Sequence, residues 1–404
     1  MTSTRRTPPW LLPWLAGLLA AAALAVGAPA PESLLVLPFA NATSNRQLDW
    51  VGDSISEILI ESLAAENVEV VAPEVRDQAM DDAGLRRYAL ITRASAIEAA
   101  IQANASLVLY GSFEVRQTAA GSGSAALLRI HAHLLDARRL VRRGSFLVEK
   151  PLAELSRAQT SLAWQALRAL RPDWLLSEEE FGRSHPAVRL DALENYARGL
   201  RAENLEQKHR FLATAARLAP DFSPVLYQLG RLNLLGFRDY SAAASWFEKV
   251  NSSDIHHRES VFYLGYCRYR TGEFAAAAAA YRRLAAVAPL PEVLNNLGAV
   301  LLRLNDPEAL PALRAAAEAN PADPDIAFNL GYALWRNGSF DEAAEALRRS
   351  LQAGDDANAT VLLGRCLQRQ GPRPGEIRLE GLERLKGEYN DAAWRALRAL
   401  VGGQ

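Results

Sequence analysis

Two short patterns of polar residues in this 404-residue chain have the spacing of reactive sites. The run WVGDSISEIL places Ser54 directly after Gly52 and Asp53, so that its hydroxyl is a candidate nucleophile for ester hydrolysis. His131 and His133 alternate along an apolar stretch, which would turn both imidazoles to one side of a strand, where they could share a metal ion. Each pattern has a structural alternative.

A structural role is the favoured interpretation of Ser54. In serine esterases of the Gly-Asp-Ser class the serine directly follows the first strand, whereas Asp53 comes 14 positions after Phe39. The Asp-x-x-His pair that such enzymes need occurs only at Asp254 and His257, far from this region. Ser54 with Glu57 instead matches a Ser-x-x-Glu capping box, which satisfies amide donors and stabilises a helix start by about 1 kcal/mol. We therefore assign no catalytic residue.

Composition and motifs give no reason to expect a cofactor, a metal or nucleic acid. His131 and His133 have no carboxylate or thiol companion close in sequence, so a solvated strand face is the favoured interpretation. No Gly-rich phosphate loop, zinc spacing or paired-carboxylate motif stands out. With 45 Lys and Arg against 46 Asp and Glu, the net charge of -1 does not favour a polyanionic partner.

The amino terminus has the three-part pattern of an export signal. Arg5 and Arg6 precede the apolar run WLLPWLAGLLAAAALAV, and small residues follow. Proline follows both Ala28 and Ala30, and residues 10–30 approach the roughly 20 apolar residues that span a bilayer, so an uncleaved anchor is the alternative. We expect residues 1–28 to be a signal peptide or membrane anchor, and the protein to be exported to the periplasm or cell envelope.

A Leu-Gly pair recurs in the second half of the chain. The pairs begin, at intervals of 35, 33, 33 and 33 residues, at Leu229, Leu264, Leu297, Leu330 and Leu363. Each of the first four is followed by a second apolar-periodic segment after a short turn, such as GEFAAAAAAYRRLAAVAP. A repeating helix pair of this length predicts a solenoid in which each unit buries its apolar face against the next.

These units resemble the tetratricopeptide repeat. The Leu-Gly pair, the glycine-aromatic turn, small residues such as Ala277 and Ala343, and closing prolines such as Pro289 and Pro321 all match that pattern. The resemblance implies an all-α superhelix over residues 187–404, ending in C-terminal capping helices, with a concave groove that binds a protein or peptide.

The resemblance also implies which residues line the groove, because the first helix of each unit faces it. Arg270, Arg303, Arg336 and Arg369 recur every 33 residues beside aromatic side chains. Such a ladder suits an extended peptide that bears carboxylates. The alternative is that these arginines complement helix dipoles, for about 0.3–1 kcal/mol each. The expected partner-binding residues are Tyr227, Arg231, Phe262, Tyr266, Tyr269, Arg270, Asn295, Arg303, Phe328, Tyr332, Trp335, Arg336, Arg365 and Arg369.

The repeat period also predicts whether the two cysteines can form a disulfide. Cys267 and Cys366 occupy the same position three units apart. At about 8–10 Å per helix layer their separation far exceeds the ~7 Å that a disulfide tolerates. We predict two free core thiols.

The region before the repeats alternates strands and helices. Apolar patterns predict strands at 33–39, 68–73, 105–115, 127–137 and 144–150, and helices at 53–66, 92–104 and 153–170. This order predicts a small layered α/β domain. The fold class is therefore multidomain, with a small α/β layered domain followed by an all-α tetratricopeptide superhelix.

The α/β region resembles the TolB amino-terminal-like domain and its CsgG and FlgO relatives. The matching motifs are LPF at 37–39, WVGD at 50–53 and YGS at 110–112. The resemblance covers residues 33–171, with a linker at 172–186, and implies a non-catalytic module that binds proteins at the cell envelope.

Together these features predict a protein–protein interaction adaptor or scaffold of the envelope, which binds an acidic partner peptide in the repeat groove. The alternatives are a subunit of a secretion or pore assembly and, less favoured, a secreted hydrolase of the Gly-Asp-Ser class.

Overall fold

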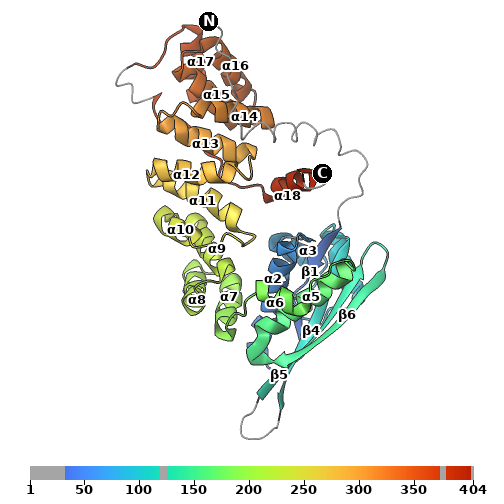
Figure 1. The fold of residues 1–404 in the computed structure, drawn as a ribbon. Helices are drawn as coiled ribbons and strands as arrows, with labels where there is room; N and C mark the ends of the chain where they lie inside the picture. Colours follow the sequence, from blue (N-terminus) through green and yellow to red (C-terminus); the bar gives the residue numbers. More distant parts are fainter. Residues whose placement is uncertain (1–31, 119–124, 374–378, 402–404) are drawn as a thin grey trace. The chain divides into compact units, whose positions relative to one another are not determined.

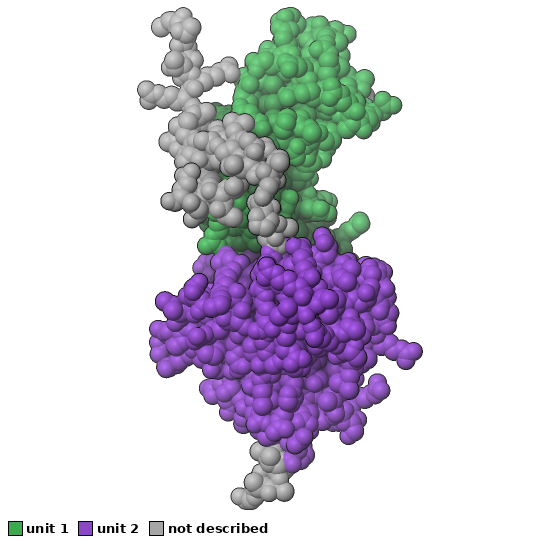
Figure 2. All heavy atoms as spheres, turned by 90° about the vertical axis from the view of Figure 1, so that its right-hand side faces the viewer, with its two compact units in different colours: residues 1–28, 233–250, 256–404 green, residues 29–232, 251–255 purple. Residues whose placement is uncertain are grey.

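A computed structural model of the chain describes residues 32–118, 125–373 and 379–401 (Figure 1). The export signal or anchor expected at residues 1–28 lies outside these ranges. In the part of the chain that is described, no helix has the length and apolar character to cross a bilayer. The chain forms two compact units, which Figure 2 distinguishes by colour. The amino-terminal unit comprises Pro29–Leu232 and Asn251–Ile255, and the carboxy-terminal unit contains Asn233–Val250 and His256–Gln404.

The amino-terminal unit is built on one mixed sheet. Its strand order is β3 (Glu69–Val70), β1 (Ser33–Val36), β4 (Leu107–Thr118), β5 (Ala125–Asp136) and β6 (Val141–Pro151), while the short β2 (Ala40–Asn41) pairs with β4. β1 runs parallel to β3 and β4, whereas β4, β5 and β6 form an antiparallel meander. The parallel strands are joined through helices and the antiparallel ones directly, as strand direction requires.

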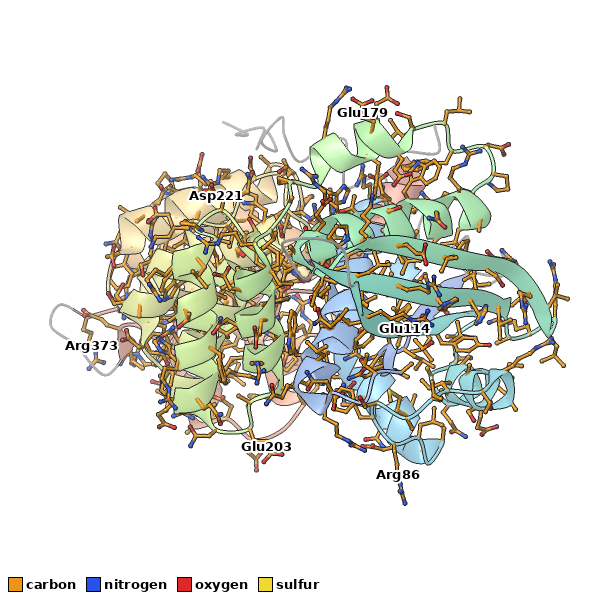
Figure 3. All side chains as sticks on the ribbon, turned by 90° about the horizontal axis from the view of Figure 1, so that it is seen from below. Arg86, Glu114, Glu179, Glu203, Asp221 and Arg373 are labelled. Carbon is orange, nitrogen blue, oxygen red and sulfur yellow. The ribbon has the colours of Figure 1, made fainter. Side chains whose placement is uncertain are left out.

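Helices cover both faces of the sheet because side chains alternate along each strand. On one face Leu34 and Leu109 pack in a core with residues of α2 (Asp49–Ala65) and α5 (Leu155–Leu170). On the other, Leu35 and Val108 pack with residues of α3 (Pro73–Asp82) and α4 (Arg93–Gln102). Charged residues such as Arg86, Glu179 and Glu203 point away from this unit (Figure 3).

Further helices complete the amino-terminal unit. They are η1 (Arg46–Leu48), η2 (Leu152–Glu154), α6 (Glu178–Ser184), α7 (Leu190–Arg201), α8 (Leu205–Leu218) and α9 (Ser223–Arg231). The helix α6 lies inside the stretch that we expected to be a linker, and its start carries a capping box between Ser177 and Glu180. Neither α3 nor α6 was predicted.

The carboxy-terminal unit is a stack of helix pairs. After the π-helical stretch η3 (Leu232–Phe237), its helices are α10 (Tyr240–Phe247), α11 (His257–Arg270), α12 (Phe274–Ala285), α13 (Pro291–Arg303), α14 (Ala309–Ala319), α15 (Pro324–Arg336), α16 (Phe340–Leu351), α17 (Ala357–Leu367) and α18 (Asp391–Val401). A Cβ at Gly298 would lie 2.5 Å from Cγ of Leu313, and one at Gly331 would lie 2.7 Å from Cγ of Leu347. The Leu-Gly pairs therefore let the two helices of a unit approach closely. The predicted fold class is confirmed.

Cys267 and Cys366 are both free and buried, as predicted. The carboxyl end differs from the expected run of capping helices. Residues 379–390 contain no α-helix or strand, and α18 follows them.

A groove occupied by the chain's own carboxyl-terminal segment

The residues from Leu379 to Asn390, called here the resident segment, lie along the first helices of three successive repeats (Figure 1). They contact α15, α13 and α11, in the face that the repeat pattern predicts to be the groove. The whole arrangement lies within the carboxy-terminal unit.

Buried asparagines hold the main chain of the resident segment. Asn329 Nδ2 donates to the carbonyl oxygen of Arg384 at 2.6 Å, and the amide of Arg384 donates to Asn329 Oδ1 at 2.8 Å. One repeat earlier, Asn296 Nδ2 donates to the carbonyl oxygen of Lys386 at 2.9 Å, and the amide of Lys386 donates to Asn296 Oδ1 at 2.7 Å. Asn295 adds a bond of 3.0 Å to the same Arg384 carbonyl. All three asparagine side chains are buried, so each unmade bond would leave an unsatisfied amide in the core.

A carboxylate of the segment enters a basic and phenolic site. Glu383 Oε1 forms an ion pair with Arg303 Nε at 2.9 Å and accepts a hydrogen bond from the hydroxyl of Tyr269 at 2.9 Å. The Glu383 side chain is 1% exposed. Burial, together with the negative charge of Glu383, raises the pKa of Tyr269 well above its usual range, so the phenol keeps the proton that it donates.

Two basic residues of the segment meet acidic groups. The Arg384 guanidinium lies 3.7 Å from the centroid of the Phe328 ring, and it pairs with Asp325 at 3.2 Å and with Asp356. Lys386 Nζ pairs with Asp323 at 2.8 Å and with Asp325 at 2.9 Å. Although burial raises the pKa of Asp325, these two cations outweigh that effect and lower it.

The end of the segment and the start of α18 continue the contacts toward α11. The rings of Tyr389 and Phe262 lie 5.7 Å apart, and the guanidinium of Arg258 lies 5.2 Å from the Trp394 ring while it pairs with Asp391 at 3.3 Å. A cavity of about 700 Å³ beside this stretch is lined by α13, by α15 and by residues 386–392.

Some of the predicted groove residues contact the segment. Tyr269, Asn295, Arg303 and Phe328 do so as described, Phe262 packs on Tyr389, and the Tyr332 hydroxyl donates to the carbonyl of Leu379 at 2.9 Å. Trp335 and Arg365 instead bond the carbonyls of Gln370 and Gly371, directly after α17.

The four arginines of the predicted ladder have different partners within the chain. Arg270 lies over the ring of Tyr240 at 4.5 Å and bonds the Tyr266 hydroxyl at 3.1 Å. Arg336 donates to the carbonyl of Leu302 at 2.8 Å, and Arg369 pairs with Asp341 at 2.9 Å. Of the four, Arg303 is the one that we find paired with the resident segment. Tyr227 and Arg231 belong to the amino-terminal unit, where the guanidinium lies 5.8 Å from the ring. Binding of a separate partner by these residues stays a prediction.

Sequence reasoning missed two of the three asparagines that bond the main chain of the resident segment. Asn296 and Asn329 each precede a Leu-Gly pair, 33 positions apart. That repeated Asn-Leu-Gly is the signal that could have identified them. The acids Asp323, Asp325 and Asp356 had no such signal, because they lie near the starts of α15 and α17, where helix-capping acids are common.

The expected capping box at Ser54 is wrong. Helix α2 begins at Asp49, so Ser54 lies in its second turn, and Ser54 Oγ accepts a hydrogen bond from Gln159 Nε2 at 2.8 Å. Both side chains are fully buried. A hydroxyl in this position joins α2 to α5, and its burial argues against reaction with a substrate.

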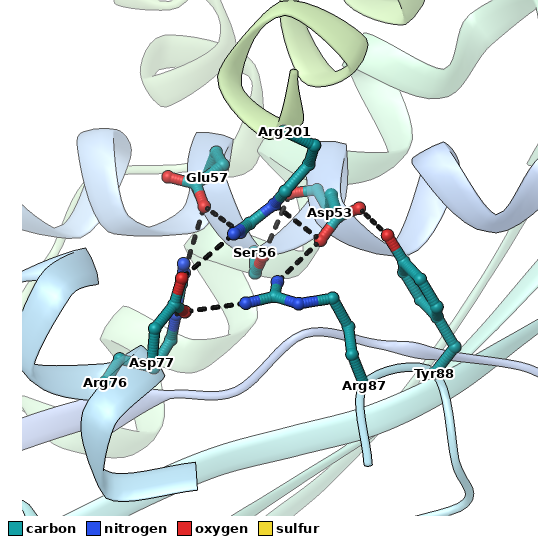
Figure 4. Close-up of polar contacts among 8 residues, drawn as sticks. All are labelled: Asp53, Ser56, Glu57, Arg76, Asp77, Arg87, Tyr88 and Arg201. Atoms are coloured by element: carbon teal, nitrogen blue, oxygen red, sulfur yellow. Dashed lines mark hydrogen bonds and ion pairs between the residues drawn. The ribbon is translucent and has the colours of Figure 1, made fainter. Parts of the chain in front are cut away.

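Glu57, the other half of that expected box, belongs to a buried ion-pair network (Figure 4). Glu57 Oε1 lies 3.0 Å from Arg76 Nη1 and 3.2 Å from Arg201 Nη2, and Arg201 also reaches Asp53 at 3.2 Å. The side chains of Asp53, Glu57 and Arg76 are buried. Because Arg201 ends α7, the network fastens that helix to α2.

The network extends to α3 and the loop that follows it. Asp77 pairs with Arg87 and with Arg201, each at 2.9 Å, and the Tyr88 hydroxyl donates to Asp53 at 2.7 Å. Three carboxylates and three guanidinium groups thus compensate one another in Figure 4. Their mutual pairing gives the cluster a structural role.

The two strand histidines face the same side of the sheet. His133 Nδ1 lies 3.1 Å from Ser145 Oγ, and its ring lies 5.4 Å from that of Tyr110. Among the described residues, no three or more His, Cys, Asp or Glu side chains are grouped so that they could hold a metal ion.

The helix pairs can now be compared with known families. The family model of the tetratricopeptide repeat matches residues 233–292, 264–309 and 296–359. Residues 233–359 are tetratricopeptide repeats. No curated protein matches the chain. The TolB-like resemblance of residues 33–171 stays a prediction.

Several solved structures resemble the chain. MamA from Desulfovibrio magneticus RS-1 is 22% identical over 40% of this chain and 92% of its own, with a TM-score of 0.35. YrrB, described as a TPR protein with an unusual peptide-binding site, is 18% identical over 47% and 91%, with a TM-score of 0.34. PilF from Pseudomonas aeruginosa is 20% identical over 44% and 83%, with a TM-score of 0.37. At these values the repeat assignment rests on the family model and the helix geometry.

Proposed function

We propose that this protein is a non-catalytic adaptor that binds an extended segment of a partner protein in the groove formed by α11, α13 and α15. The observation that carries the proposal is the reciprocal bonding of Asn296 and Asn329 to the main chain of the resident segment. Every extended peptide offers the same alternating amide and carbonyl groups, so a groove that forms hydrogen bonds with these groups suits a peptide ligand.

The chemistry of the groove supports binding over reaction. Its buried amides, its phenol and its charged groups are directed at main-chain atoms and at side chains of a peptide. Anchor rings such as Phe328 and Phe262 supply contact area beside them. A repeat array that holds a peptide in this way can serve as a scaffold for other proteins.

We further propose that the adaptor works outside the cytoplasm, at the cell envelope. The support is the export-signal pattern of residues 1–28 and the resemblance of residues 33–171 to TolB-like envelope domains. In this arrangement the α/β domain would provide a second protein-binding module.

Affinity capture from an envelope extract tests the groove. The bait is the full chain with Arg384→Glu and Lys386→Glu, called here the undocked variant, in which new carboxylates face Asp323, Asp325 and Asp356 and the groove residues are unchanged. The comparison bait adds Asn296→Ala and Asn329→Ala. A partner captured by the first bait and lost from the second supports the proposal. A partner captured equally by both baits would contradict binding in this groove.

A further inference from the structure

We propose that the resident segment is an internal competitor, and that its sequence defines the class of partner: an extended peptide with an acidic residue followed by basic residues one and three positions later. The inference rests on the proposed function and specifies the ligand and the regulation of the same groove.

The spacing of the groove charges sets this pattern. Glu383 faces Arg303 and Tyr269, the next residue Arg384 faces Asp325 and Asp356, and Lys386 faces Asp323 and Asp325. A continuous acidic peptide would place carboxylates against Asp325, where like charges repel. The single acid that the groove accepts lies beside Arg303, because Arg270, Arg336 and Arg369 are paired elsewhere in the array.

A small residue two positions before the acid belongs to the same pattern. Gly381 has a φ of +67°, and a Cβ at this position would lie 2.3 Å from Arg303 Nη1. Any other residue there would be strained in its backbone and would displace the guanidinium that binds Glu383. The competing peptide is therefore expected to follow the order Gly-x-Glu-basic-x-Lys, as in GLERLK of this chain.

The way in which the segment is held suits displacement. Leu382 and Leu385 are only partly buried, whereas Leu379 and Tyr389 near the two ends of the segment are buried. Main-chain bonds and ion pairs therefore hold the middle of the segment. A separate peptide with the same spacing can remake each of these contacts. The tether favours the resident segment, because a short connection supplies an effective concentration of about 1 mM. A partner must exceed that advantage, so the segment sets a threshold for binding.

A labelled peptide of residues 379–390, LEGLERLKGEYN, tests the competition by fluorescence anisotropy. We expect the undocked variant to bind it about 10- to 100-fold more tightly than the wild-type full chain, since the tethered competitor is removed. The matched control is Glu388→Lys, which changes a charge at an exposed position of the same segment. This control should bind like the wild type. Equal affinity of the wild type and the undocked variant would overturn the proposal, as would absence of peptide binding to both.

A second measurement uses the unmodified protein, in case the undocked variant does not fold. Hydrogen exchange of the wild-type chain is followed with and without excess unlabelled peptide. Displacement predicts faster exchange at the amides of Arg384 and Lys386 of the chain, which Asn329 and Asn296 protect. A control peptide in which the residues equivalent to Glu383 and Lys386 are swapped should leave the hydrogen-exchange rates of these two amides unchanged. Unchanged exchange with the native peptide at saturating concentration would also overturn the proposal.

The two proposals fail in distinguishable ways. If a partner binds the wild type and the undocked variant equally well through the asparagines, the groove functions but the segment is no competitor. If the peptide binds the undocked variant more tightly while no envelope protein depends on Asn296 and Asn329, competition holds and the adaptor role fails.

Discussion

Asn329 and Arg384 form a reciprocal pair in the groove. Asn329 Nδ2 donates to the carbonyl oxygen of Arg384 at 2.6 Å, and Asn329 Oδ1 accepts from the main-chain amide of Arg384 at 2.8 Å. The two residues are 55 positions apart in the chain. This geometry satisfies both main-chain groups of one peptide residue regardless of its side chain. Under the proposed function, the charges around the pair would then select among peptides.

Replacement of Asn329 by alanine should weaken docking of the resident segment by about 1–3 kcal/mol, because the Arg384 amide and carbonyl lose buried partners. Hydrogen exchange measures the effect, and the Arg384 amide should show the largest acceleration. Asn337→Ala is the matched control, since Asn337 is exposed at the end of the same helix. Equal exchange in both variants would show that the asparagine does not hold the segment.

Arg303 and Arg336 should respond differently to charge reversal, although they occupy the same position in successive repeats. Arg303→Glu breaks the pair with the buried Glu383, and we expect docking to weaken by about 1–3 kcal/mol. Arg336→Glu should leave the segment docked, because Arg336 bonds the Leu302 carbonyl. Protection of the Lys386 amide reports docking in each case. Adding Glu383→Arg to Arg303→Glu should restore it, and failure of this rescue would argue against a direct charge pair.

The buried pair of Arg76 and Glu57 should be costly to break. Arg76→Met leaves the Glu57 carboxylate buried with fewer partners, and we expect the amino-terminal unit to lose about 3–5 kcal/mol of stability. Thermal unfolding measures the loss. Arg86→Met, at an exposed position near the network, serves as control and should change little. Adding Glu57→Leu to Arg76→Met should recover part of the loss, and no recovery would indicate that packing of Arg76 matters more than its charge.

Asp77 should make stability depend on acid pH. Burial alone would raise its pKa, but Arg76, Arg201 and Arg87 outweigh burial and lower the pKa to about 2 from 3.8. A depressed carboxyl pKa stabilises the fold fully above 3.8, and this contribution disappears as the pH falls toward 2. The difference in Tm between the wild type and Asp77→Asn should therefore be largest near neutral pH and should shrink as the pH falls from 3.8 to about 2. A difference that stays constant with pH would contradict the assignment.

The two thiols should be unreactive in the folded protein. Burial raises the pKa of Cys267 to about 12 and that of Cys366 to about 11, so almost no thiolate exists at neutral pH. A chromogenic disulfide reagent should label neither residue in the native state and both after denaturation. Rapid labelling of the native protein would show that the helix pairs around a cysteine open readily.

The sequence by itself determined the repeat array, because the pattern is local and recurs. The Leu-Gly pairs every 33 residues specify where helices approach, and Gly298 and Gly331 lie against Leu313 and Leu347 as that pattern requires. The separation of the cysteines followed from the same period. The strands and most helices of the α/β region were also predictable from apolar alternation, whereas α3 and α6 were missed, the latter inside a stretch read as a linker.

Only the tertiary structure decided what each polar side chain contacts. Ser54 and Glu57 have the spacing of a capping box, yet a helix start five residues earlier turns one toward Gln159 and the other toward Arg76. Arg303 and Arg336 occupy equivalent positions in successive repeats, yet Arg303 pairs with Glu383 of the resident segment and Arg336 bonds the Leu302 carbonyl within the array. The resident segment contacts a groove residue 114 positions away in sequence, and a local sequence period cannot predict such a return of the chain. Short-range patterns fix the helices, but long-range packing assigns their partners.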